Sequence, residues 1–107
     1  MYLKLNISDA DRAVLLHNLW RMHDIFVEMG DTGPQFFADY KDMLDSIERR
    51  KDLDPTSVEL VLRTMEQIRE HNLLGPERAH QADTLSRIEA DIKRDGRTMF
   101  KKFRMPF

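Results

Sequence analysis

Apolar residues recur every three or four positions in four stretches of this chain, and each stretch lies between helix start and stop signals. This spacing places side chains on one face of an α-helix, whereas a half-buried strand would need strict alternation. In the first stretch the apolar stripe consists of Leu15, Leu19, Met22, Phe26 and Met29. Ser8 precedes it as an N-cap, and Gly30 follows it as a left-handed C-terminal cap. The pattern predicts a helix over residues 9–29.

Three further helices are predicted over residues 34–51, 55–74 and 76–95, each opening with a proline in its first turn. Gly75 marks the end of the third. Gly96 is a stop signal for the fourth, but Met99 and Phe103 fall on the same stripe as Ile88 and the other apolar residues before it. A glycine inside a helix costs only about 1 kcal/mol. The fourth helix is therefore expected to stop near residue 95 or to run on, straight or kinked, to residue 104.

Short connections between helices of this length favour antiparallel neighbours. The 107 residues are enough for one domain with a substantial core. We therefore expect residues 1–107 to form a single all-α domain, an antiparallel four-helix bundle with a long or kinked C-terminal helix. Leu3, Leu5 and Ile7 alternate with polar residues, which predicts a short extended N-terminus. It could pair with its counterpart in a dimer, but plain extended chain is the expectation.

The composition excludes several classes of protein. The chain has no cysteine, so it contains neither a disulfide framework nor a thiolate zinc site. No apolar run approaches the roughly 20 residues that a membrane span requires. The first seven residues are too short and too polar for a signal peptide. A cytoplasmic protein is the expectation.

Charge is distributed unevenly between the body and the C-terminal segment. Residues 93–107 contain six basic residues and one acidic residue, a net charge of +5, and since the whole chain carries −2 the remainder carries −7. The predicted partner-binding residues of this segment are Lys93, Arg97, Phe100, Lys101, Lys102, Phe103 and Arg104. A basic amphipathic helix can bind nucleic acid, an anionic membrane or an acidic groove on a protein. Alternatively, its aromatic side packs on the core, or it lies on the acidic helices of a second subunit.

Polar residues on the first helix form the other candidate site. His17, Arg21, Asp24 and Glu28 lie along one strip, which is an ordinary solvated face on a surface and an acid–base cluster if buried. His23 falls inside the apolar arc, where a histidine is usually packed neutral with one hydrogen bond. The polar site predicted here consists of His17, Arg21, His23 and Asp24.

No catalytic motif accompanies these residues. Glu77 and His80 share a face near the start of the fourth helix, and His71 lies close by in the sequence, but they lack the further ligands of a four-helix metal site. The paired carboxylates Asp42 and Asp45 face away from the apolar stripes. We therefore expect no bound metal, no cofactor and no enzymatic activity.

The leading functional hypothesis is a non-enzymatic regulatory or scaffolding module that binds a protein partner as a homodimer. It depends on three features: the broad apolar surface of the first helix, where Leu16, Trp20 and Val27 lie beside the core stripe, the seven methionines of the chain, and the uneven charge distribution. Such a helix is either central in the fold or part of a subunit interface. Two alternatives stay open: a nucleic-acid-binding protein that uses the basic aromatic C-terminal segment, and a small metal-binding or hydrolytic helical protein.

Overall fold

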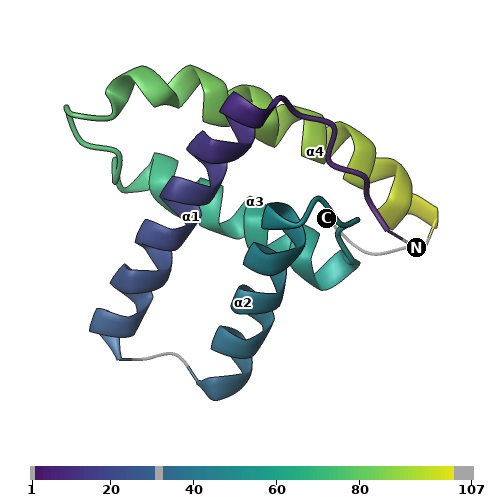
Figure 1. The fold of residues 1–107 in the computed structure, drawn as a ribbon, viewed down its shortest axis with the longest axis horizontal. Helices are drawn as coiled ribbons and strands as arrows, with labels where there is room; N and C mark the ends of the chain where they lie inside the picture. The colour runs from purple at the N-terminus through teal and green to yellow at the C-terminus, as the bar shows by residue number, and fades with distance from the viewer. Residues whose placement is uncertain (1, 31–32, 103–107) are drawn as a thin grey trace.

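The computed structural model describes the backbone of residues 2–30 and 33–102, and the side chains of these residues up to Asp95. The described residues form four α-helices and one short 3₁₀ helix (Figure 1). The helices are α1 (Asp9–Met29), α2 (Pro34–Glu48), α3 (Pro55–Glu70) and α4 (Ala82–Lys102), and the 3₁₀ helix η1 spans Ala79–Gln81. This confirms the all-α fold class predicted from the hydrophobic periodicity.

The helices are arranged as two antiparallel hairpins. In Figure 1, α1 and α2 lie side by side and run in opposite directions, and α3 and α4 form a second pair that crosses the first. The distal halves of α1 and α2, next to their connecting loop, extend beyond α3 and α4. The C-terminal half of α1 therefore has fewer neighbouring helices than its N-terminal half.

The core lies where the two hairpins cross. Leu53, in the connection between α2 and α3, is fully buried there. The other fully buried side chains are apolar residues that recur mostly three or four positions apart along the helices: Leu15, Leu19, Tyr40, Met43, Leu44, Ile47, Val58, Val61, Ile88 and Ile92. Burying one such side chain contributes about 1.5–3 kcal/mol to the stability of the fold. The crossing therefore holds the hairpins together mainly through aliphatic packing.

The N-terminal segment is extended, as predicted, and it has a partner within the same chain. The backbone amide of Leu3 donates to the carbonyl of Leu53 at 2.7 Å, and the amide of Leu53 donates back at 2.8 Å. Both side chains are buried in the core. Residues 3–7 then follow residues 91–95 of α4, with a small cleft between the two segments. An isolated antiparallel bridge thus closes the molecule across the connection between α2 and α3.

The third helix ends at Glu70, four residues before the predicted end at residue 74. Asn72 takes the left-handed conformation (φ 50°), and the amide of Leu73 donates to the carbonyl of Ile68 at 2.9 Å. Together with the bond from the Asn72 amide to the Arg69 carbonyl at 3.3 Å, these contacts form a Schellman C-cap. Asparagine is the residue after glycine that tolerates this conformation best, so it ends the helix before Gly75 does.

The second helix also ends earlier than predicted, at Glu48 instead of residue 51. Here Arg50 is the left-handed residue (φ 59°), and the amide of Lys51 donates to the carbonyl of Ser46 at 2.8 Å. The amide of Arg50 donates to the Ile47 carbonyl at 3.3 Å, which completes the same capping motif. No residue pattern predicted this cap, because arginine is not a usual left-handed residue.

The fourth helix begins at Ala82 rather than at residue 76. Turns occupy residues 71–78, and η1 leads into the helix. The guanidinium of Arg78 donates to the Leu73 carbonyl at 2.9 Å and stabilises the turn. At its other end the backbone of α4 continues through Gly96 to Lys102, so the long C-terminal helix is confirmed.

Candidate interaction surface

The outer stripe of α1, which we define as Leu16, Trp20, His23 and Val27, combines apolar character with exposure. These residues are spaced by four, three and four positions, so they share one side of the helix. Trp20 is 43% exposed and Val27 is 55% exposed, whereas Leu16 and His23 are partly buried. Isolated exposed apolar residues are common, but a tryptophan aligned with a valine along one helix forms a ridge that a second surface can cover.

Aromatic contacts hold Trp20 against the molecule. The ring of His23 lies between three aromatic rings, with its centroid 5.3 Å from Trp20, 5.6 Å from Phe37 and 5.9 Å from Tyr40. The contacts with Trp20 and Phe37 are edge-to-face, and aromatic contacts of this geometry are worth about 0.5–1.5 kcal/mol each beyond the area they bury. His23 therefore links the exposed Trp20 to the buried Tyr40, and the stripe has a rigid base.

Tyr40 is the innermost member of this aromatic group. It is fully buried, and its hydroxyl donates to the backbone carbonyl of Leu19 at 2.6 Å. Burial raises the pKa of Tyr40 well above its ordinary value of 10.0 because the phenolate would lose its hydration. The contact fixes α2 against the middle of α1, where the outer stripe begins.

The four residues of the predicted polar site do not face the same way. His17, Arg21 and Asp24 are exposed, whereas His23 is turned towards the aromatic rings. Only one contact joins the four side chains among the described interactions, from His23 Nδ1 to Asp24 Oδ1 at 3.3 Å. The charged residues thus form a solvated strip beside the outer stripe and do not converge on a common point.

Asn18 is a buried polar residue that connects two distant segments. Its amide nitrogen donates to the Val14 carbonyl and to Gln81 Oε1, both at 2.9 Å. A buried amide left unpaired would cost about 1–3 kcal/mol, so the bond to Gln81 ties α1 to η1, directly before α4, in one register.

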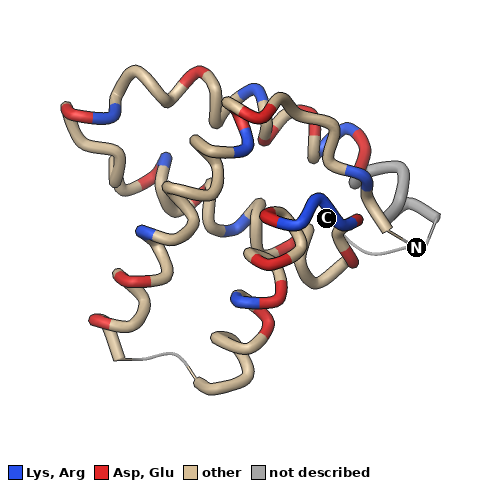
Figure 2. Tube along the Cα trace, viewed as in Figure 1, with Lys and Arg blue, Asp and Glu red and all other residues tan. Residues whose placement is uncertain are grey.

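The predicted partner-binding segment is described only in part. Lys93 Nζ lies 3.5 Å from Glu89 Oε2, so this lysine forms an ion pair within its own helix. The side chains of Arg97, Phe100, Lys101, Lys102, Phe103 and Arg104 lie outside the described residues. Acidic residues recur along α2 (Figure 2). The proposed contact between the basic segment and an acidic helix, like the nucleic-acid alternative, stays a prediction.

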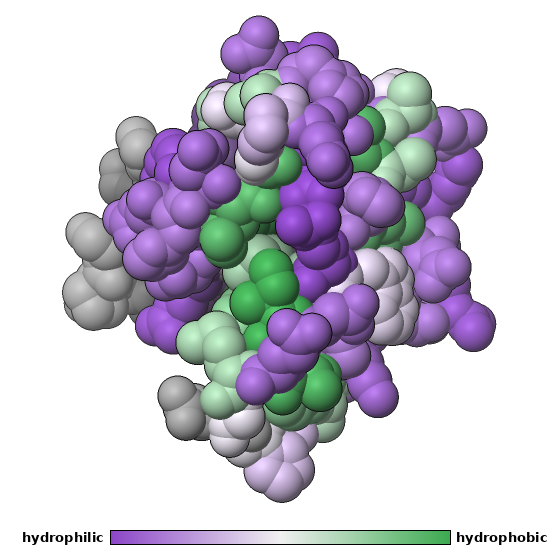
Figure 3. All heavy atoms as spheres, turned by 90° about the vertical axis from the view of Figure 1, so that its left-hand side faces the viewer, coloured by the Kyte–Doolittle hydropathy of each residue, from purple (hydrophilic) through white to green (hydrophobic). Residues whose placement is uncertain are grey.

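Three other features of the surface bear on function. Among the described residues, no group of three or more His, Asp or Glu side chains is placed to hold a metal ion, and Glu77, His80 and His71 are exposed. No described helix combines the length and apolarity required to cross a membrane. On the face seen in Figure 3, apolar side chains gather in a hollowed band framed by hydrophilic ones.

Comparison with known proteins does not assign this surface. No protein-family model matches the sequence. No curated protein matches it. No solved structure matches it. The surface must therefore be interpreted from its own residues.

Proposed function

We propose that the protein is a non-enzymatic interaction module that forms a homodimer through the outer stripe of α1. The observation that carries the proposal is the exposure of Trp20 at 43% on a rigid aromatic base beside Val27. Tryptophan in a prearranged position is the side chain most enriched at the energetic centre of protein interfaces. Covering it would also remove the largest exposed ring of α1 from water.

The partner we propose is a second copy of the chain, because the charges beside the stripe are self-complementary. The solvated strip beside the outer stripe has His17 and Arg21 in its N-terminal half and Asp24 and Glu28 in its C-terminal half. All four residues are exposed. In a two-fold dimer with antiparallel α1 helices, each basic half lies beside the acidic half of the other copy. Arg21 then faces the Asp24 of its partner, which favours this orientation over a parallel one.

The test uses the fact that Trp20 is the only tryptophan of the chain. Sedimentation equilibrium should show a concentration-dependent dimer, and over the same concentrations the tryptophan emission should shift to shorter wavelength as the ring leaves water. Val27→Asp should abolish both effects because it places a charge on the apolar stripe that the dimer buries.

Two controls make the test specific. Met29→Asp changes another exposed apolar residue of α1, 59% exposed but outside the stripe, and should leave the dimer intact. Arg21→Glu should weaken the dimer, and adding Asp24→Arg should restore it by exchanging the charges. A strict monomer at all concentrations, or a Val27→Asp variant that still dimerises, would refute the proposal.

A further inference from the structure

His23 gives the outer stripe of α1 an ionisable group, since the other three members of the stripe carry none. Its side chain is 13% exposed. Its ring contacts Trp20 on the outer side and the rings of Phe37 and Tyr40 on the α2 side. A charge on His23 would therefore lie directly beside the tryptophan that the proposed dimer covers.

The groups around His23 come from two helices. On α1, ring atom Nδ1 lies 3.3 Å from Asp24 Oδ1, and Asp24 carries the only charge that contacts this ring among the described interactions. On α2, Phe37 is uncharged, and the phenol of Tyr40 stays neutral because burial raises its pKa. Lys41 follows Phe37 by one helical turn and is exposed. A proton on His23 thus has one carboxylate to pair with.

The proposed dimer uses the same carboxylate. With antiparallel α1 helices, Arg21 of each copy faces Asp24 of the other, so a protonated His23 repels that arginine and competes with it for Asp24. This pairing also places the two-fold axis beside residues 21–24. The His23 rings of the two copies then lie near each other, close to the axis, on the faces that meet. Two positive charges at this position oppose association, because the interface removes them from water.

We infer that His23 makes the dimer dependent on pH, so that the neutral ring allows association and the protonated ring reverses it. The inference rests on the dimer proposed above. Histidine is the side chain whose charge ordinarily changes between pH 5 and 8. A proton on His17 has the opposite effect, because in the proposed dimer His17 lies beside the acidic half of the second copy. Weaker association at low pH therefore distinguishes His23 from His17.

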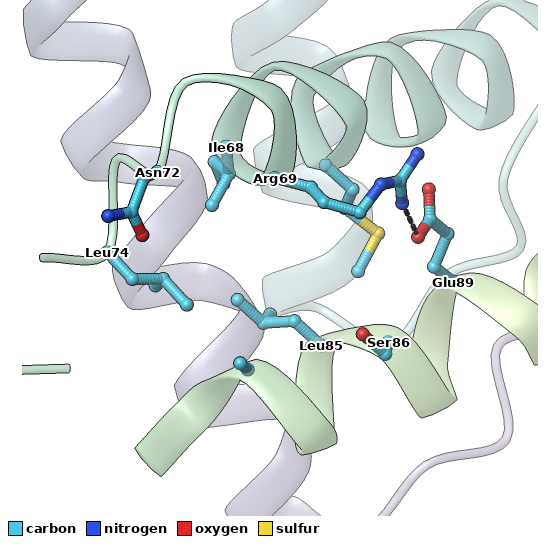
Figure 4. A pocket seen from close by; sticks show the side chains of 9 residues that line it. Ile68, Arg69, Asn72, Leu74, Leu85, Ser86 and Glu89 are labelled. Atoms are coloured by element: carbon cyan, nitrogen blue, oxygen red, sulfur yellow. Dashed lines mark hydrogen bonds and ion pairs between the residues drawn. The ribbon is translucent and has the colours of Figure 1, made fainter. Parts of the chain in front are cut away.

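The buried carboxylate of Glu89 lies apart from this group. It accepts a hydrogen bond from Arg69 at the edge of a hollow between α3 and α4 (Figure 4). No histidine is among the described residues that line the hollow. The contact between α3 and α4 thus does not depend on the charge of a histidine, and we expect the folded chain to persist at the pH where the dimer dissociates.

The experiment is sedimentation equilibrium of the full chain at pH 8 and pH 5.5 at one ionic strength, with circular dichroism to follow the helices. The dissociation constant of the dimer should be about tenfold or more larger at pH 5.5. In His23→Phe, which keeps an aromatic ring but takes up no proton, the ratio of the two constants should fall to about one or below. His23→Gln should give the same ratio and serves if the larger ring is not accommodated. His71→Gln removes an exposed histidine outside α1 and should keep the wild-type ratio.

The outcomes separate this inference from the dimer itself. A strict monomer at pH 8 would refute the dimer and the inference together. A dimer at pH 8 that is equally tight or tighter at pH 5.5 would overturn only the role of His23. The same conclusion would follow if the helices were lost at pH 5.5, or if the variants at position 23 kept the wild-type ratio.

Discussion

At the scale of single residues, Tyr40 shows how one polar atom is accommodated in an aliphatic core. Its ring contacts Phe26, Phe36 and His23, and its hydroxyl reaches the Leu19 carbonyl. The ring contributes packing and the hydroxyl contributes position, because a phenylalanine would fit the same space without fixing α2 relative to α1. This tyrosine therefore supports the outer stripe from beneath.

Tyr40→Phe should lower the free energy of unfolding by about 1 kcal/mol at pH 8, the usual worth of one internal hydrogen bond. The pKa of Tyr40 is raised in the folded state, so the native protein keeps the phenol neutral while the unfolded chain ionises near pH 10.0. The wild type should therefore lose stability as the pH rises above 10, by about 1.4 kcal/mol one unit above that value.

Urea unfolding of both proteins at pH 8 and pH 11 measures this difference. The variant lacks the titrating phenol, so the advantage of the wild type should largely disappear at pH 11. Other titrating groups, including the exposed Tyr2, are common to both proteins. Stability curves that stay parallel between the two pH values would show that Tyr40 is not responsible.

At the scale of helices, the ends of α2 and α3 depend on single residues in the left-handed conformation. Asn72 suits this role, whereas Arg50 adopts it at φ 59° against the preference of its own backbone. The steric cost of this conformation is offset by the burial of Ile47 and Leu53, on either side of the turn, in the core. The chain therefore reverses within a few residues between α2 and α3.

Arg50→Gly should stabilise the protein by about 1 kcal/mol, because glycine adopts the left-handed conformation without the steric penalty. The substitution also removes the ion pair between Arg50 and Asp9, but both side chains are largely exposed and such pairs contribute little. Arg49→Gly is the matched control, since Arg49 has a negative φ of −88° and gains nothing from glycine. Thermal unfolding that ranks Arg50→Gly below the wild type would contradict this account of the cap.

At the scale of the whole molecule, the N-terminal segment acts as a strap across the two hairpins. It begins beside α4, and Leu3 pairs with Leu53 in the connection between α2 and α3 before the chain enters α1. Arg12 strengthens the same junction, because its guanidinium donates to the Ile47 carbonyl at 2.8 Å and to the Leu5 carbonyl at 3.4 Å. Contacts between residues far apart in the chain thus close the fold.

Leu3→Ala should destabilise the protein by about 2 kcal/mol or more, the range found when a buried leucine is truncated in a core. Leu3 is 5% exposed, whereas its neighbour Lys4 is exposed. Lys4→Ala should therefore change the free energy of unfolding by less than about 0.5 kcal/mol. Equal effects of the two substitutions in chemical denaturation would show that the strap does not contribute to the core.

The sequence by itself determined the helical fold class and most of the core, because a 3–4 spacing specifies which side chains share a helix face. Leu15, Leu19, Met22 and Ile88 were placed correctly on this basis. The spacing could not show that the outer stripe of α1 would stay uncovered, because this depends on where α2 and α4 pack.

The partners that matter most are far apart in the sequence and became visible only in the folded chain. Asn18 meets Gln81, Leu3 meets Leu53, and Glu89 is buried against Arg69. A local pattern records only the preferences of neighbouring residues, whereas burial is decided by the segments that tertiary packing brings together.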